Sequence, residues 1–261
     1  MLRSLIGTPR GGIFKATGDR HIYIVWMALV WAGMIAGFLP DIARFRSEAP
    51  PPPFILDFHG VVFFLWLVAV STQIALVETG KPAVHRQVGW WIVGLSALLV
   101  PLALVASMVD MVRETAPAHN DPLSLSGQPQ FLGLEFQAMV VFAILLTLAV
   151  RMRHDLAAHK RLMVLLLVCV LDPGTARAWS TFSPINFAGP FGWWLSYFWG
   201  NATLVAAMIG WDLWRHGRVH PVLIWGGALI AFGELTAVYL EFAPWWHVSA
   251  MQLTNWWHWA G

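Results

Sequence analysis

Residues 54–78 read FILDFHGVVFFLWLVAVSTQIALVE, an apolar run whose charged residues lie only near its two ends. A helix of about 20 apolar residues spans the hydrocarbon core of a membrane, so this run is long enough to cross it. Similar runs follow along the chain, in which 58% of the residues are hydrophobic and only 11% are charged, against about 25% in soluble domains. The sequence therefore predicts an all-α, multi-pass membrane protein, and its 261 residues leave no room for a soluble domain as well.

Seven transmembrane helices are expected from the apolar runs. The predicted spans are 21–39, 54–78, 86–109, 131–151, 159–181, 188–213 and 220–242. Short connections at 79–85, 152–158 and 214–219 join the last six spans into three hairpins, so the predicted domain is one helix plus three hairpins. The run Pro50–Pro53 cannot be helical and is expected to be extended.

The C-terminal tail is rich in tryptophan and is too short and too polar to be another span. Amphipathic segments of this kind lie in the membrane interface, so we expect an interfacial helix. The chain then divides into a cytoplasmic segment at 1–20, the transmembrane domain at 21–242 and a periplasmic interfacial tail at 243–261. The tail tryptophans are Trp245, Trp246, Trp256, Trp257 and Trp259.

Lysine and arginine predict the orientation of these spans, because cytoplasmic loops carry an excess of both. Only Arg44, Arg46 and Arg113 lie on the opposite side. Twelve of the 16 lysines and arginines fall on the side of the N-terminus and the short loops: Arg3, Arg10, Lys15, Arg20, Lys81, Arg86, Arg151, Arg153, Lys160, Arg161, Arg215 and Arg218. The N-terminus is therefore predicted in the cytoplasm and the C-terminus outside, which agrees with an odd number of spans.

The three short inner loops resemble one another. They read TGKPAVHRQVGWW at 79–91, RHDLAAHKRLMVL at 153–165 and RHGRVHPVLIWGG at 215–227, and each places a histidine at the start of the next helix. This pattern indicates either a threefold internal repeat or the shared chemistry of loops at a membrane surface.

Several short motifs carry a resemblance to a group of proteins. They are HG at 59–60, Gln73, HRQVG at 85–89, HKRLM at 159–163 and AR at 176–177. Together they resemble a group of bacterial multi-pass inner-membrane proteins with no assigned activity. The resemblance implies location in the bacterial inner membrane, and it implies no catalytic residue.

Composition excludes several function classes. A formal net charge of +2 without a basic block does not predict binding to nucleic acid. The single cysteine, Cys169, rules out an internal disulfide and a thiolate cluster within the chain.

Ionisable residues inside the apolar runs are the most informative feature for function, because each costs several kcal/mol in hydrocarbon, roughly 2.5–3.5 on insertion scales. At a rise of about 1.5 Å per helical residue, most of them fall at one level in the periplasmic half of the bundle. They are Asp57, His59, Glu135, Asp172, Arg177 and Glu234, joined by Tyr197 and Asn201. We therefore expect one shared polar chamber, in which Arg177 pairs with one of the four acids.

Roles within this chamber follow from residue chemistry. We predict catalytic or acid–base roles for Asp57, His59, Glu135, Asp172 and Glu234, ligand binding by Arg177, Tyr197, Asn201, Gln73 and Trp66, and a metal site built from His59, Asp57 and Glu135.

Simpler interpretations compete with these roles. The positions of Asp57 and Glu135 also fit carboxylates that cap helix ends at the membrane interface. The Arg177 side chain can extend outward to water. Asp172-Pro173-Gly174 is also typical of an ordinary helix break. His59, Trp66 and Gln73 recur every seven residues, a spacing that fits a pocket wall or a helix–helix seam equally well.

Four function classes remain open. One is a redox or ligand-binding protein, with a divalent metal, haem b or a quinone as cofactor; for haem, the inner side offers His21, His85, His159 and His220. A second is an enzyme acting on a lipidic or small substrate, although no HExxH, GxSxG or phosphate-loop motif is present. The others are a proton-coupled transporter and a structural or assembly subunit whose partners are protein subunits of a larger membrane complex. In all four the chain lies in the lipid bilayer.

Overall fold

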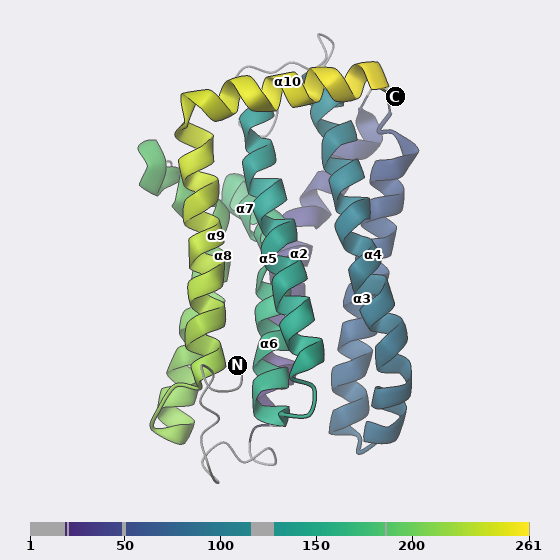
Figure 1. The fold of residues 1–261 in the computed structure, drawn as a ribbon, viewed down its shortest axis with the longest axis vertical. Helices are drawn as coiled ribbons and strands as arrows, with labels where there is room; N and C mark the ends of the chain where they lie inside the picture. The colour runs from purple at the N-terminus through teal and green to yellow at the C-terminus, as the bar shows by residue number, and fades with distance from the viewer. Residues whose placement is uncertain (1–18, 20, 49–50, 116–127, 186, 261) are drawn as a thin grey trace.

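The computed structural model describes residues 19, 21–48, 51–115, 128–185 and 187–260, and within these ranges the chain is helical with no strand. The elements are α2 (Ile22–Ser47), α3 (Phe54–Glu78), α4 (Pro82–Glu114), the short 3₁₀ helix η1 (Pro129–Phe131), α5 (Leu132–Arg151), α6 (Leu156–Val168), α7 (Asp172–Phe182), α8 (Gly189–His216), α9 (Pro221–Phe242) and α10 (Pro244–Ala260). Figure 1 shows them as an upright bundle with α10 lying across one end. The prediction of an all-α fold is confirmed for these residues.

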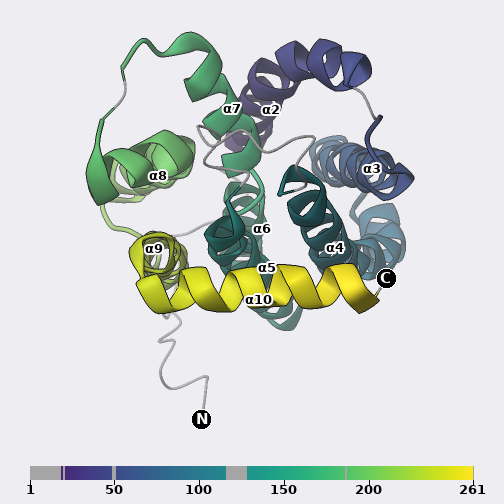
Figure 2. The same cartoon turned by 90° about the horizontal axis from the view of Figure 1, so that it is seen from above.

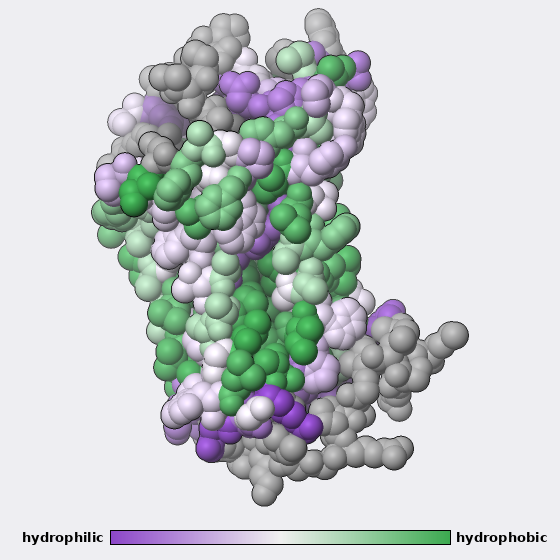
Figure 3. All heavy atoms as spheres, turned by 90° about the vertical axis from the view of Figure 1, so that its left-hand side faces the viewer, coloured by the Kyte–Doolittle hydropathy of each residue, from purple (hydrophilic) through white to green (hydrophobic). Residues whose placement is uncertain are grey.

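Five of the described helices are long and apolar enough to cross a membrane: α2, α3, α4, η1 continued by α5, and α9. The pair α6 and α7, bent by 45° at a short break, makes a sixth span if the two helices are counted together. Hydrophobic side chains cover the middle of the surface in Figure 3, and hydrophilic ones gather toward its two ends. These features indicate a multi-pass membrane protein in contact with the lipid bilayer.

Several predicted boundaries are wrong by more than a turn. We expected the first helix to stop before Pro40, but α2 runs through this residue to Ser47. A proline inside a helix removes one backbone hydrogen bond, a cost that packing of the rest of the helix can offset. The second difference is at α4, which begins at Pro82 and ends at Glu114, whereas the predicted span was 86–109. Pro82 suits the first turn of a helix, where its missing N–H has no partner to lose.

Other parts of the prediction lie at the edge of the described residues. Pro51–Pro53 are non-helical, as expected. The predicted cytoplasmic segment lies outside the described residues except for Asp19, and so do the side chains of Arg44 and Trp259.

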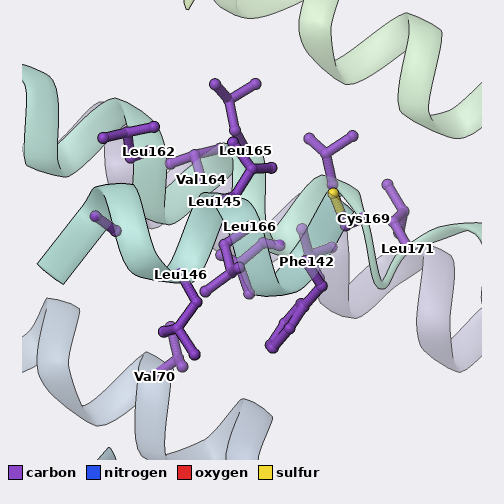
Figure 4. Close-up of a cluster of buried hydrophobic side chains, with 14 of the residues drawn as sticks. Val70, Phe142, Leu145, Leu146, Leu162, Val164, Leu165, Leu166, Cys169 and Leu171 are labelled. Carbon is purple, nitrogen blue, oxygen red and sulfur yellow. The ribbon is translucent and has the colours of Figure 1, made fainter. Parts of the chain in front are cut away.

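Helix α6 occupies the centre of the bundle, with α2, α5, α8 and α9 packed around it (Figure 2). Its sequence LAAHKRLMVLLLV is apolar on every side after its first turns, which is the pattern of a helix buried all round. Figure 4 shows Leu162, Leu165 and Leu166 of this helix packed against Phe142 and Leu145 of α5. The largest cluster of buried hydrophobic side chains among the described residues therefore includes most of α6, which leads directly to the polar groups described next.

The break between α6 and α7 positions a carboxylate inside the bundle. The chain turns at 169–171, and α7 then begins with Asp172-Pro173-Gly174. Gly174 lies against α2 so closely that a Cβ added at Gly37 would overlap the Gly174 carbonyl oxygen. A Cβ at Gly200 of α8 would lie 2.6 Å from the Thr175 hydroxyl oxygen. Small residues on three helices thus allow α7 to cross tightly between α2 and α8.

The two ends of the bundle differ. The α3–α4, α5–α6 and α8–α9 connections lie together at the end opposite α10 (Figure 1). At the other end α10 packs on η1, α4 and α9, and the indole N–H of Trp246 donates to the Gln130 carbonyl oxygen at 2.8 Å. We refer below to the end that carries α10 as the outer end and to the other as the inner end.

Candidate functional site

A small polar cavity lies where α5, α7, α8 and α9 meet, above the aliphatic layer. The space open to the centre of a water molecule is about 10 Å³, which is room for about one water. The cavity is lined by Gln137, Ala138, Val141, Cys169, Asp172, Asn201, Ile230 and Glu234. Three of the residues singled out from the sequence, Asp172, Asn201 and Glu234, are thus brought together by the fold.

Glu234 is the best-connected acid of this cavity. Its side chain is buried, with 5% exposure, although it lies in the interior of α9. The indole N–H of Trp194 donates to one carboxylate oxygen at 3.0 Å, and the Asn201 amide donates to the other at 3.3 Å. The side-chain oxygen of Asn201, Oδ1, is buried and accepts no hydrogen bond, so it remains available as an acceptor in the site.

Asp172 occupies the first turn of α7, where the helix N-terminus favours negative charge. It is 4% exposed, and neither it nor Glu234 forms an ion pair with any described residue. Glu135 lies at the level of the cavity on α5 and accepts a hydrogen bond from the Ser107 hydroxyl at 3.1 Å. The site therefore holds acids whose neighbours are amides, hydroxyls and indoles rather than bases.

Close packing between helices shapes this cavity. A Cβ added at Gly233 would lie 2.7 Å from a methyl carbon of Val141 and would also overlap the Gln137 amide oxygen. The missing side chain lets α9 approach α5 so that Gln137 and Glu234 line the same space. A larger residue at position 233 would displace Gln137 and Val141, two of the residues that line the cavity.

Arg177 does not pair with any of the four predicted acids. Its Nε donates to Asp41 of α2 at 2.9 Å, its guanidinium lies over the Phe38 ring at 4.7 Å, and it also donates to the Pro173 carbonyl. The prediction was wrong because α2 continues past Pro40, which brings Asp41 to the outer end of α7. Arg177 is therefore paired with Asp41, and it forms no ion pair with an acid of the cavity among the described residues.

The predicted metal ligands are not gathered. Asp57 is exposed in the first turn of α3, and His59 is half-buried beside Phe63 with its Nδ1 unpartnered. Within the described part of the chain, no three His, Cys, Asp or Glu side chains lie close enough to hold a metal ion. His59, Asp57 and Glu135 therefore do not form the expected ligand set.

The stripe on α3 forms a helix–helix seam. Trp66 is fully buried, donates to the Ser96 hydroxyl of α4 at 2.8 Å and packs edge-on against Phe142. Gln73 is buried two turns further along α3, and neither the nitrogen nor the oxygen of its side-chain amide forms a hydrogen bond. Neither residue lines the cavity.

The inner histidines considered for haem mostly serve other roles. The His21 imidazole lies 3.2 Å from Glu78, and His159 Nδ1 lies 2.9 Å from the Ala149 carbonyl oxygen. His220 caps α9 by accepting the Val222 N–H at 3.2 Å, and burial lowers the pKa of His220 to about 4. His85 keeps a buried Nδ1 without a partner. The three loop histidines, at 85, 159 and 220, thus differ in their contacts.

A second charged cluster, at the inner end, was missed from the sequence. Arg161 of α6 and Asp212 of α8 form a bidentate ion pair with exposures of 3% and 2%, and Asp212 also accepts the His220 backbone N–H at 2.9 Å. Asp19 lies 4.0 Å from the same guanidinium and 3.0 Å from His216 Nε2. Asp212, an aspartate in the apolar run of α8, was the one signal of this cluster in the sequence. Arg161 gave no such signal, because it was counted among the basic residues of the inner loops.

Comparisons with protein-family models, with curated proteins and with solved structures each gave no significant match.

Proposed function

We propose that this protein is a proton-coupled membrane transporter in which Glu234 and Asp172 take up and release protons. The observation that carries the proposal is the cavity that both acids line, without a basic partner, beside a helix broken in mid-bundle. Acidic residues buried in transmembrane bundles without a counter-ion are typical of proton relays. Broken helices are typical of the binding sites of carriers.

Each remaining site residue has a proposed role. Asn201 holds the Glu234 carboxyl by its amide, and Glu135 supplies a further negative charge at the same level. Arg177, paired with Asp41, fixes the outer end of α7 and thereby the place of Asp172. Tyr197 lies one helical turn before Asn201 on α8 and does not line the cavity itself. The metal hypothesis lacks comparable support, because within the described residues its predicted ligands are not gathered.

The membrane topology is part of the same proposal. We infer seven spans, with α8 as the span that its polar and charged residues make hardest to recognise and with α6 and α7 together as one broken span. The positive-inside rule then assigns the inner end and residues 1–20 to the cytoplasm, and α10 with the tail 243–261 to the periplasmic surface. Residues 21–242 form the transmembrane domain, and the membrane is the bacterial inner membrane by the resemblance described above.

Removal of the Glu234 carboxylate is the first test. Vesicles that contain the protein and a pH-sensitive dye are given a pH gradient. We expect the wild-type protein to dissipate it at least tenfold faster than empty vesicles, and Glu234→Gln and Asp172→Asn to return the rate to that of empty vesicles. The control is Asp155→Asn, which removes an inner carboxylate and keeps the N-cap of α6. Wild-type flux in Glu234→Gln would contradict the proposal.

A role as an assembly subunit is the second candidate. A shallow apolar groove of about 400 Å³ between the outer ends of α9 and α10 favours it, because Leu235, Tyr239 and Trp245 line the groove and are exposed. Purification in a mild detergent separates the two: a partner recovered in fixed ratio from cells supports the subunit, and proton flux by the protein alone supports the transporter.

A further inference from the structure

A third buried carboxylate, Glu241, lies above the cavity on the same helix. It follows Glu234 by seven residues on α9, which places it on the same face about 10 Å nearer the outer end. Its side chain is only 6% exposed, and its Oε2 is buried without a hydrogen-bond partner. Residues near the end of a membrane helix can reach water or headgroups, so a carboxylate enclosed there requires an explanation.

Helix α10 and η1 enclose this carboxylate. His247 Nε2 of α10 lies 2.6 Å from the Glu241 carbonyl oxygen, and the Gln130 side chain of η1 lies beside the carboxyl group. Trp246 fixes Gln130 by donating to its backbone carbonyl. Glu241 is therefore covered from outside by the helix that closes the outer end.

Tyr197 of α8 connects the level of Glu241 with the level of Glu234. Its ring lies beside Phe131 of η1, the short helix whose Gln130 side chain lies beside the Glu241 carboxyl group. It also precedes Asn201, the residue that donates to Glu234, by one helical turn on the same face. The Tyr197 ring is held by contacts with Trp193 at 4.6 Å and Phe131 at 5.4 Å between centroids.

The surroundings of this polar line are apolar. Leu134, Trp193, Phe198 and Ala237 are buried between the two levels and form one cluster with the Tyr197 ring. His247 of α10 contacts Glu241 through the Glu241 backbone carbonyl oxygen, and Gln130 lies beside the carboxyl group itself. Within the described residues, Glu241, Tyr197 and Asn201 therefore form a line of polar groups through this apolar region.

We propose that Glu241 is the outer proton relay of the transporter, and this inference rests on the function proposed above. The Glu241 carboxylate takes up a proton that enters from the outer surface past α10 and η1. The Tyr197 hydroxyl then accepts that proton while it releases its own toward the Glu234 carboxylate, directly or through one water. Charge and protons balance, since Glu241 returns to the carboxylate as Glu234 becomes the acid.

The rate at which Glu234 becomes protonated tests the relay. The purified protein in lipid nanodiscs is subjected to a rapid drop in pH, and the infrared carboxyl band assigned by its loss in Glu234→Gln is followed in time. We expect Glu241→Gln to slow the rise of this band at least tenfold. Tyr197→Phe, which keeps the ring contacts and removes only the hydroxyl, should slow it by a similar factor. Asp110→Asn removes a half-exposed carboxylate at the outer end of α4 and should leave the rate unchanged.

The outcomes separate the relay from the transporter. Wild-type rates in both Glu241→Gln and Tyr197→Phe would overturn the relay, while the flux test with Glu234→Gln would still stand or fall by itself. If Glu241→Gln does not fold, the Tyr197→Phe rate decides alone. A Glu234 band that responds to pH without any proton flux in vesicles would reject the transporter and leave a proton-binding site with an outer entrance.

Discussion

Replacing Arg161 with leucine is expected to lower the free energy of unfolding by about 3–5 kcal/mol, the usual cost of removing one partner of a buried ion pair. The reason is that Asp212 and Asp19 would stay buried without the guanidinium that faces both. The measurement is a reversible denaturant titration of the protein in detergent micelles, read by tryptophan fluorescence.

Two further variants show whether the loss comes from unpaired charge. In Arg161→Met with Asp212→Asn, both charges are removed and the asparagine oxygen can still accept the His220 N–H, so most of the stability should return. Arg215→Gln changes an exposed arginine on α8, the helix that carries Asp212, and should alter the free energy of unfolding by no more than about 0.5 kcal/mol. An Arg161→Leu protein as stable as the wild type would show that the pair contributes nothing.

Gly37→Ala, which adds a single methyl group, is expected to lower the free energy of unfolding by about 3 kcal/mol, the upper end of the usual cost of overpacking a core. The new Cβ would overlap the Gly174 carbonyl oxygen and lie 2.7 Å from its carbon. Because these are backbone atoms, α2 and α7 would have to move apart. Asp172 lies two residues before Gly174, so Gly37→Ala should also reduce proton flux.

Gly94→Ala is the matched control for this substitution. Gly94 lies inside α4, and a Cβ added there would meet nothing within 4 Å. Alanine should therefore stabilise the helix by about 0.5–1 kcal/mol through its better helix propensity. The denaturant titration described above measures both variants. Equal stability of Gly37→Ala and Gly94→Ala would refute the close packing of α2 against α7.

The helices could be predicted because their signal is local. Long apolar runs separated by short basic loops locate α3, α5 and α9 within a few residues, and the Pro-Gly pair after Asp172 correctly indicated a break. The end of α2 could not be predicted, since Pro40 normally predicts a stop and only the ion pair of Asp41 with Arg177 shows why the helix continues.

The cavity could be predicted in part. Counting residues along each helix placed Asp172, Asn201 and Glu234 at one depth, and the structure brings these three together. The counting gives depth but not direction around the bundle, so it also included Asp57, which is exposed. Arg161 and Asp212 were missed for a related reason: each looks like an ordinary residue near the end of a helix until the packing of α6 against α8 buries both.

Infrared difference spectroscopy of the protein between neutral and acid pH tests whether the acids of the cavity exchange protons with water. A pH-dependent carboxyl band that disappears in Glu234→Gln and shifts in Asp172→Asn is the predicted result. A spectrum without such a band, or with one that both substitutions leave unchanged, would contradict the assignment of this cavity as a proton-binding site.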